Sequence, residues 1–335
     1  MANHDILAIG TSAGGLDALR TLAGGLPDDL AASVLVVLHL PPHFQSSLDA
    51  ILSQSGPLPA TFARDGERCE KRHIYIAPPA SHLLIEDRHL RLGYGPRENN
   101  ARPAIDPLFR SAGLCCGGRS IGVVMTGTLG DGAAGLQALK QCGGVTVVQD
   151  PDDATFPEMP ATALRQSKPD HVVGLAAMPA LLETLVRQPA GAPAEVPELV
   201  REEVAIARDG NVRMSHMDRI GRRSVLACPD CHGVLWEIDE GGLVRYRCHV
   251  GHAYTAELLS AALDEGLRGA IASAARVLDE RIALARRLME EDRRNGHNGL
   301  AESWARKLRD AEKEADVLRA AIRRVDEIAA QALQE

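Results

Sequence analysis

The sequence predicts an α/β fold: a doubly wound, mostly parallel sheet of the Rossmann-like type, followed by a small zinc ribbon and an antiparallel α-helical hairpin. Short apolar runs alternate with helical patterns over residues 1–187. Many of these runs are continuous stretches of Val, Ile and Leu, which are typical of parallel strands covered on both faces. Cysteines and histidines then cluster within residues 228–252, and a helical, charge-rich segment follows from residue 256.

The expected elements of residues 1–187 follow from the spacing of their apolar side chains. Strands are expected at 5–10, 34–38, 74–77, 83–85, 90–92, 121–125, 145–148 and 171–173. Helices are expected from residue 16 onward and at 45–54, 106–116 and 133–141. The strands at 83–85 and 90–92 are expected to pair as a hairpin. This alternation favours right-handed crossovers between parallel strands.

Composition narrows the class of protein. The chain has 335 residues, of which 45% are hydrophobic and 24% charged, enough for two or three globular domains. A net charge of −8 argues against a nucleic-acid partner bound through phosphate neutralisation. No apolar stretch has the length of a membrane span, and the N-terminus lacks the basic region of a signal peptide. We therefore expect a cytoplasmic protein with no direct membrane insertion.

Residues 10–14, Gly-Thr-Ser-Ala-Gly, fit the pattern G-x-S-x-G. In that pattern a sharp strand-to-helix turn presents the serine hydroxyl above the edge of a sheet. The flanking glycines allow backbone angles and close approaches that a β-carbon would obstruct. Backbone N–H groups at the start of the next helix can face a developing oxyanion. A phosphate-binding turn is the alternative, although the spacing misses G-x-G-x-x-G and no Walker lysine follows.

Three chemically complementary side chains follow predicted strands. Ser12 follows the first strand, His39 follows the second, and Asp131 lies a short glycine-rich turn beyond the strand at 121–125. The carboxyl ends of parallel strands share one edge of the sheet, so these residues are expected to converge there. They would act as nucleophile, base and orienting carboxylate. Taken one at a time, Ser12 could be a turn residue, His39 a histidine at the end of a strand, and Asp131 a helix cap. His43, which follows two prolines, is the less favoured candidate for the base.

Five stretches, in the same order along the chain, resemble the catalytic domain of the CheB-type chemotaxis protein-glutamate methylesterases. They are residues 9–15, 38–41, 102–109, 126–133 and 156–160. The resemblance covers about residues 1–187. It implies hydrolysis of glutamate γ-methyl esters on the cytoplasmic helices of chemoreceptors, often with glutamine deamidation at such sites, and no catalytic cofactor. It also implies that Ser12, His39 and Asp131 hold the family's nucleophile, base and orienting positions.

The sequence departs from the family pattern at several positions. Ala13 stands where many members have threonine, so only its backbone N–H is expected to serve as an oxyanion donor. Thr128 stands in place of part of a Met-Gly pair and is the expected second donor. Arg102 is a candidate for steering acidic receptor helices, with a solvated loop arginine as the alternative. The typical enzyme begins with a receiver domain, whereas this sequence begins at the first catalytic strand, so we expect its control to differ.

The clustered cysteines have metal-ligand spacing. Cys228 and Cys231 form a C-x₂-C pair, and Cys248 and two histidines follow after 16 residues. Such a set can hold a structural Zn²⁺ tetrahedrally, with His252 favoured over His249 as the fourth ligand. Two strand patterns flanking 239–242 predict a hairpin, which makes residues 224–255 a zinc-ribbon-like module. Packing of three free thiols without metal is the alternative. The module also resembles a C-terminal extension of some methylesterases.

The remaining segments are a linker and a helical hairpin. Residues 188–223 are expected to be a linker and connecting segment, because 188–199 are rich in Pro and Ala. Residues 256–335 are expected to form two helices broken at 294–299, with a narrow apolar seam. The seam residues expected are Leu263, Leu267, Ala270, Ala274 and Val277 in the first helix, and Trp304, Leu308, Ala311, Ala315, Leu318, Ile322, Val325 and Ala329 in the second. A self-contained hairpin is favoured over a surface for docking or self-association.

Three functions remain open from the sequence. The leading hypothesis is a serine-type methylesterase acting on chemoreceptors. The second is an esterase that uses the same triad on another protein or a small ester outside chemotaxis. The third is a non-catalytic interaction scaffold in which the ribbon and the hairpin are the working parts.

Overall fold

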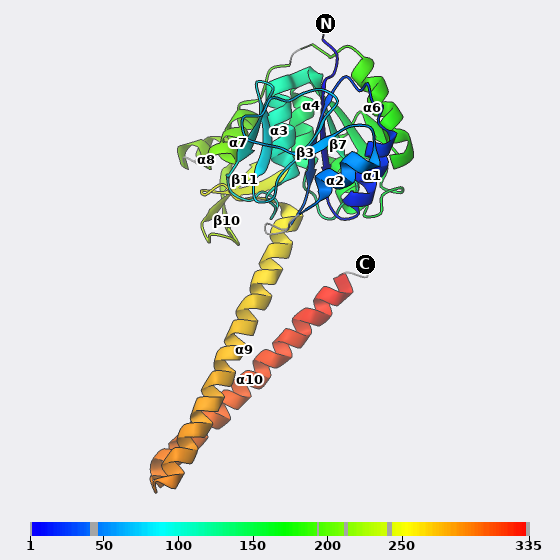
Figure 1. The fold of residues 1–335 in the computed structure, drawn as a ribbon. Coiled ribbons are helices and arrows are strands. Elements are labelled where there is room, and N and C mark those ends of the chain that lie inside the picture. Colours follow the sequence, from blue (N-terminus) through cyan, green and yellow to red (C-terminus); the bar gives the residue numbers. More distant parts are fainter. Residues whose placement is uncertain (1, 41–45, 193, 211–213, 240–242, 333–335) are drawn as a thin grey trace. The chain divides into compact units, whose positions relative to one another are not determined.

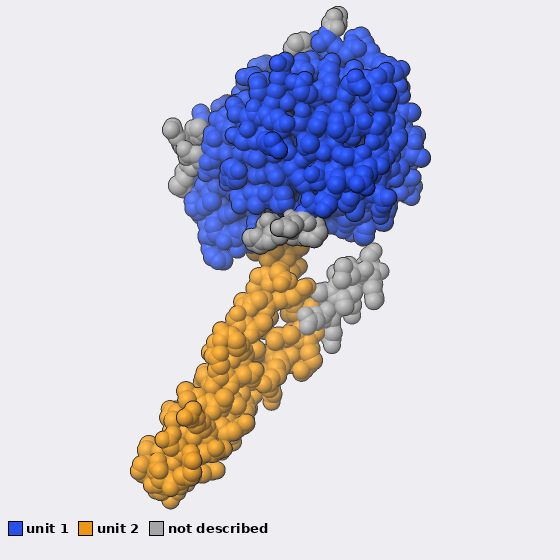
Figure 2. Space-filling view, viewed as in Figure 1, with its two compact units in different colours: residues 1–259 blue, residues 260–335 orange. Residues whose placement is uncertain are grey.

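The computed structural model describes residues 2–40, 46–192, 194–210, 214–239 and 243–332. The chain forms two compact units, residues 1–259 and 260–335 (Figures 1 and 2). The first unit contains both the sheet predicted for the N-terminal half and the cysteine-rich module. The second consists of long helical segments.

A seven-stranded parallel sheet forms the centre of the first unit, with the order β3-β4-β2-β1-β7-β8-β9. The predicted doubly wound fold is confirmed. The short strand β3 was not predicted, because its residues Ala-Thr-Phe lack the Val and Ile side chains that mark the other short strands. The strands are β1 (Ile6–Thr11), β2 (Ser33–Leu38), β3 (Ala60–Phe62), β4 (Ile74–Ile76), β7 (Ser120–Val124), β8 (Val145–Gln149) and β9 (His171–Val173).

Helices cover both faces of this sheet (Figure 1). Leu7 and Ile9 of β1 pack into one apolar cluster with α1 (Gly15–Gly25), α2 (Leu48–Ser55) and α6 (Met178–Arg187). Ile6 and Ala8 pack into the other with α3 (Ile105–Cys116), α4 (Ala133–Gln141) and α5 (Glu158–Ser167). Successive residues of β1 thus enter opposite cores, as the pleat of a strand requires. Short 3₁₀ turns lie at Gly117–Arg119 and Leu175–Ala177.

The strand order reverses between β1 and β7, which makes this point the topological switch of the sheet. In doubly wound sheets the ligand crevice lies outside the carboxyl ends of the strands at such a switch. Beside the sheet, β5 (His82–Glu86) and β6 (His89–Gly93) form the predicted antiparallel hairpin. Leu83, Ile85 and Leu90 of this hairpin pack into the same cluster as α3.

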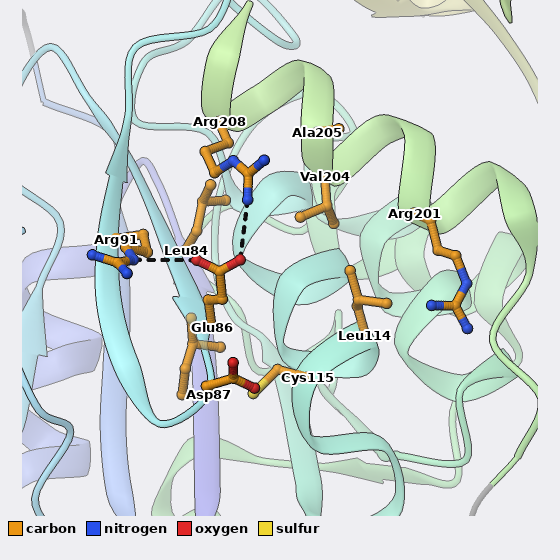
Figure 3. Close-up of a pocket in the computed structure, with 11 residues that line it drawn as sticks. Leu84, Glu86, Asp87, Arg91, Leu114, Cys115, Arg201, Val204, Ala205 and Arg208 are labelled. Carbon is orange, nitrogen blue, oxygen red and sulfur yellow. Dashed lines mark hydrogen bonds and ion pairs between the residues drawn. The ribbon is translucent and has the colours of Figure 1, made fainter. Parts of the chain in front are cut away.

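Residues 198–220, predicted as connecting segment, hold two helices, α7 (Glu198–Asp209) and α8 (Met214–Ile220). Six of the twelve residues of α7 are charged, which obscures its apolar face in the sequence. Val200 of α7 nevertheless packs against Ala138 and Cys142. Figure 3 shows α7 beside α3 and the β5–β6 hairpin, where Arg208 pairs with Glu86 at 3.0 Å. A cleft of about 370 Å³ lies between these elements.

The cysteine-rich module is a four-stranded antiparallel sheet, which we call the ribbon. Its strands are β10 (Arg222–Ala227), β11 (Val234–Asp239), β12 (Val244–Cys248) and β13 (Ala253–Thr255). β11 and β12 pair antiparallel as predicted, although residues 240–242 of their expected turn lie outside the described residues. Trp236 and Ile238 pack with Met217 of α8, so the helices and the ribbon share a core.

Five buried ionised side chains join the ribbon to the rest of the first unit; we call them the buried charge cluster. They are Glu98, Arg110, Glu203, Arg245 and Arg247, each at most 2% exposed. Arg110 of α3 pairs with Glu98 at 2.6 Å and with Glu203 of α7 at 2.9 Å. Arg245 of β12 donates two hydrogen bonds to Glu203, at 2.9 and 3.0 Å. Arg247 lies 3.0 Å from both glutamates.

The cluster fixes the positions of the elements that carry it. Burial opposes ionisation of Glu203, but the guanidinium groups of Arg110, Arg245 and Arg247 outweigh it and hold the pKa of Glu203 well below its usual value. Moving one element away would leave a charge buried without its partner, which costs several kcal/mol. Thus α3, α7, β12 and the loop at Glu98 form one body.

The second unit contains most of an antiparallel helix pair, α9 (Ala256–Arg294) and α10 (Asn298–Ala332). The seam predicted for α10 contains buried Leu308, Ala311 and Ala315; Ala329 lies outside the residues whose side chains are described. The seam predicted for α9 is wrong, because Leu263, Leu267 and Val277 are 42%, 51% and 45% exposed. The helix instead buries a stripe one residue further on, which includes Leu278 and Ala285. Periodicity does not distinguish two adjacent heptad stripes.

None of the helices in the described ranges, α9 and α10 included, combines the length and the apolarity needed to cross a membrane.

Replacing the central arginine of the buried charge cluster tests its contribution to stability. Arg110→Met keeps much of the side-chain volume but removes the ion pairs of Arg110 with buried Glu98 and Glu203, and leaves Arg247 as their one shared partner among the described residues. We expect the free energy of unfolding in urea to fall by about 3–5 kcal/mol. Arg222→Met is the control, because Arg222 pairs with Glu237 while 86% exposed, and should cost less than about 1 kcal/mol. Equal small effects of both substitutions would show that the cluster does not stabilise the unit.

Candidate active site

The turn after β1 places Ser12 at the switch point. Gly14 has a φ of 72°, a left-handed conformation that favours glycine. A β-carbon on Gly10 would lie 2.2 Å from Ile105 Cγ2, so glycine also allows α3 to approach this strand. The Ser12 N–H donates to the carbonyl of Thr126, just beyond β7, at 3.0 Å. The glycines and this bond therefore tie the serine to both strands of the switch point.

His39 connects the serine to Asp131. Its Nδ1 lies 3.1 Å from Ser12 Oγ, and its Nε2 lies 2.8 Å from Asp131 Oδ2. When the neutral ring carries its proton on Nε2, that N–H donates to the carboxylate, and Nδ1 accepts a hydrogen bond from the hydroxyl. The side chain is 22% exposed, so the ring borders solvent on one side.

Asp131 is 2% exposed and is surrounded by donors. Its Oδ2 accepts the Ile105 N–H at 2.7 Å, at the N-terminus of α3. Its Oδ1 accepts the Asn99 amide at 2.7 Å, the Gly132 N–H at 3.0 Å and the Asp106 N–H at 3.3 Å. Burial opposes ionisation, but His39 and these donors outweigh it and hold the pKa of Asp131 below its usual value. The dipole of α3 also favours an anion at this position.

A second carboxyl group lies beside Asp131. Asp106, 1% exposed, accepts the Gly135 N–H at 2.6 Å and the Asn99 amide at 2.9 Å. Burial, and then the nearby negative charge of Asp131, raise the pKa of Asp106 to about 7, against the opposing effect of Arg110. One amide therefore bridges an ionised carboxylate and a carboxyl group that holds its proton in the acid range.

The structure brings the three sequence-predicted residues Ser12, His39 and Asp131 into one hydrogen-bonded chain. Sequence reasoning missed Asn99, which also contacts this chain. Adjacent asparagines at 99 and 100 both have positive φ and indicate a turn, but a turn signal does not disclose a partner 32 residues away. The competing His43 lies outside the described residues.

The backbone around Ser12 offers candidate oxyanion donors. A β-carbon on Gly127 would lie 2.9 Å from Ser12 Cβ, so the segment 126–128 passes directly beside the serine. The N–H of Gly127 donates to Phe156 O, and that of Leu129 donates to Glu158. Within the described residues, the N–H groups of Ala13 and Thr128 have no hydrogen-bond acceptor. These two groups can therefore accept a substrate oxygen as partner.

A cleft of about 370 Å³ opens beside His39 and is lined in part by Arg97 and Arg102. Arg102 is half-buried, and its Nη1 donates to the carbonyls of Gly95 at 2.9 Å and Tyr94 at 3.3 Å. These bonds hold the guanidinium in the wall of the cleft. The cleft therefore combines a polar edge at His39 with fixed positive charge.

In the ribbon, the ligand atoms of Cys228, Cys231, Cys248 and His252 all lie within 4.8 Å of one another. Cys231 Sγ is 3.6 Å from Cys248 Sγ, and His252 Nδ1 is 3.4 Å from Cys248 Sγ. Two sulfurs at the usual Zn–S distance would be about 3.8 Å apart in a tetrahedron, so the spacing fits. His249 packs against Gly233 instead, where a β-carbon would lie 2.1 Å from its Cε1.

The sheet order and the serine-bearing turn at its switch point are those of an α/β protein with a hydrolase-type site. The model of the CheB methylesterase family matches residues 7–182. The chain belongs to this family.

Individual relatives agree with the family match. A Leptospira interrogans protein is 36% identical over 174 residues, 52% of this chain and 90% of that protein. The "Protein-glutamate methylesterase/protein-glutamine glutaminase 2" of Methanosarcina acetivorans is 37% identical over 182 residues, 52% of this chain and 51% of that protein. The chain thus spans about half of the latter. The crystal structure of the Thermotoga maritima CheB methylesterase catalytic domain aligns with a TM-score of 0.53 and 30% identity, over 56% of this chain and 100% of that one.

The raised pKa of Asp106 predicts a pH dependence of stability. An unfolded aspartate releases its proton near pH 3.9, whereas the folded protein retains it until about pH 7. Between these values the folded state binds more protons, so this residue makes the free energy of unfolding fall as pH rises. We expect Asp106→Asn to gain stability relative to the parent from about pH 5 to pH 7 and to level off above. A difference that stays constant over this range would contradict the raised pKa.

Proposed function

We propose that this protein is a serine-type methylesterase that hydrolyses glutamate γ-methyl esters on the cytoplasmic helices of chemoreceptors. The observation that carries the proposal is the hydrogen-bonded chain Ser12–His39–Asp131 at the switch point of a family fold. Residues 1–187 would be the catalytic domain, working in the cytoplasm. The names of relatives that include glutaminase support glutamine deamidation as a second reaction of the same site.

The geometry supports a two-step acyl transfer. Ser12 Oγ attacks the γ-carbonyl carbon while His39 Nδ1 takes its proton, and Asp131 stabilises the imidazolium that forms. The tetrahedral oxyanion accepts hydrogen bonds from the N–H groups of Ala13 and Thr128. As the C–O bond breaks, His39 returns the proton to the methoxide, which leaves as methanol. A water molecule, deprotonated by His39, then attacks the carbonyl carbon of the glutamyl ester. As the bond to Ser12 Oγ breaks, His39 returns the proton to Oγ, and the glutamate side chain leaves as a carboxylate.

The substrate is a side chain on a receptor helix, and such helices carry acidic residues around their methylation sites. Arg102, held in the wall of the cleft, would favour their approach electrostatically. Because a guanidinium at a cleft rim acts mainly on encounter, its contribution belongs to binding of the substrate and not to the chemical step.

Substitutions in the triad test this proposal through methanol release from a methylated receptor fragment. We expect Ser12→Ala, His39→Gln and Asp131→Asn each to lower kcat by about 10⁴-fold or more, because the three groups act as a unit. Ser55→Ala is the matched control: its hydroxyl donates to Ile51 O within α2, and kcat should stay at the parental value.

The outcomes separate the three candidate functions. Methanol release that is lost in the three triad variants but kept in the parent and in Ser55→Ala supports the methylesterase. Hydrolysis of small esters that depends on Ser12, without methanol release from receptor, would favour an esterase outside chemotaxis. A Ser12→Ala protein that retains its full cellular function would favour the interaction scaffold.

We also propose that Cys228, Cys231, Cys248 and His252 hold a structural Zn²⁺ in the module 224–255. Three sulfurs and one imidazole nitrogen are the donor set that tetrahedral zinc prefers. Four protein ligands leave no open position for a water or a substrate, so the ion would stabilise the ribbon and take no part in the reaction.

Metal analysis tests the zinc site. We expect about one zinc ion per chain by atomic emission, and its loss in Cys228→Ser, because three remaining donors hold the ion more weakly. Cys69→Ser is the control, since Cys69 is buried in the core of the sheet and should keep the zinc. Zinc content that is the same in both variants would remove this assignment.

A further inference from the structure

The ribbon contacts the active-site loop through the backbone next to the metal-ligating group. The Asn99 N–H donates to the Ala253 carbonyl at 2.8 Å, and the Ala253 N–H donates to the Arg97 carbonyl at 3.3 Å. Ala253 directly follows His252, the fourth member of that group. Glu98, in the middle of the loop 97–99, therefore forms a parallel β-bridge with Ala253, the residue after His252.

Arg247 makes the same connection through its side chain. It precedes Cys248, and its Nη1 donates at 2.8 Å to the carbonyl of Gly251, inside the turn between Cys248 and His252. Its Nη2 pairs at 3.0 Å with Glu98, the residue before Asn99. Both Arg247 and Glu98 are at most 1% exposed, so neither charge can exchange its partner for water. One guanidinium thus joins the turn of the metal-ligating group to the active-site loop.

Asn99 completes the connection to the triad. Asn99 is 7% exposed. Its side-chain amide donates to Asp131 Oδ1 at 2.7 Å and to Asp106 Oδ2 at 2.9 Å. The amide is therefore the group between two carboxyl groups, and it sets which oxygen of Asp131 faces His39. A shift of the loop would rotate the Asp131 carboxylate or bring the two carboxyl groups into direct repulsion.

We propose that the ribbon positions the triad: its folding around a metal ion fixes the loop 97–99, and Asn99 then holds Asp131 toward His39. Metal occupancy of the ribbon thereby controls the rate of the esterase. This rests on the proposed function, and it assigns Asn99, Glu98 and Arg247 as positioning residues. The ribbon lies outside residues 7–182, which match the family, so this control would be an addition to the family's catalytic domain.

Metal occupancy would matter because the ion cross-links Cys228 and Cys231 to Cys248 and His252, and this cross-link is lost when the metal is removed. Without the ion, the turn at 248–252 is held by few bonds, because a closed metal site supplies much of the folding free energy of a small ribbon. The Ala253 carbonyl, one residue beyond that turn, then no longer holds the N–H of Asn99 in place, although Arg247 still pairs with Glu98. Because Asp131 acts by stabilising charge that develops on His39, its misplacement should lower kcat and leave KM unchanged.

Hydrogen exchange measured by mass spectrometry on the full chain tests the coupling without reference to activity. We expect zinc removal with a chelator to speed exchange by roughly tenfold or more in the peptides that cover 97–106. Peptides from β8 should keep their rates, which excludes global unfolding, and added Zn²⁺ should restore slow exchange. Unchanged exchange in 97–106 after proven loss of zinc would overturn the inference, whatever the activity of the protein.

Steady-state kinetics of methanol release test the positioning role. We expect Asn99→Gly, which keeps the positive φ of 51°, to retain zinc and KM but to lose about 10²-fold in kcat. Arg247→Gln should also lower kcat, whereas Arg222→Gln, on the exposed face of the ribbon, should leave kcat unchanged. Parental kcat in zinc-loaded Asn99→Gly, or in protein freed of zinc, would contradict the proposal. Absence of methanol release from the parent would instead refute the proposed function.

Discussion

A buried carboxylate at the edge of the sheet constrains the arrangement of the N-terminal half of this protein. Asp131 is 2% exposed and stays ionised only because donors surround it. These donors come from separate parts of the chain: a loop amide at Asn99, the N-terminus of α3 at Ile105 and Asp106, and Gly132 before α4. Meeting this requirement brings α3 close to β1, an approach that also requires Gly10 in the serine-bearing turn.

Further buried charges lie next to Asp131, and each of them also needs a partner. Burial, and then the negative charge of Asp131, raise the pKa of Asp106 to about 7. Beyond it, Arg110 is neutralised by Glu98 and Glu203, which in turn pair with the ribbon arginines. Buried charges tolerate little displacement of their partners. The sheet, α7 and the ribbon therefore form one compact unit, whereas the sequence suggested separate segments joined by a linker.

The features that sequence predicted depend on local patterns. Strand-end positions located Ser12, His39 and Asp131, because the carboxyl ends of parallel strands always share an edge. The C-x₂-C spacing located the cysteines that the structure gathers with His252. By contrast, Asn99 meets Asp131 across 32 residues, and Arg245 meets Glu203 across 42, and no local periodicity encodes such pairs. The register of α9 failed for a different reason: two apolar stripes satisfy the same heptad, and only the partner helix selects one.

The most direct test of this account is covalent labelling of the intact protein with a serine-reactive fluorophosphonate, followed by peptide mapping with mass spectrometry. The account predicts that one label per chain lands on Ser12, and that the labelling rate falls sharply in His39→Gln and Asp131→Asn, because the hydroxyl is activated only through the imidazole and its carboxylate. A label on another serine, or an undiminished rate at Ser12 in those two variants, would contradict it.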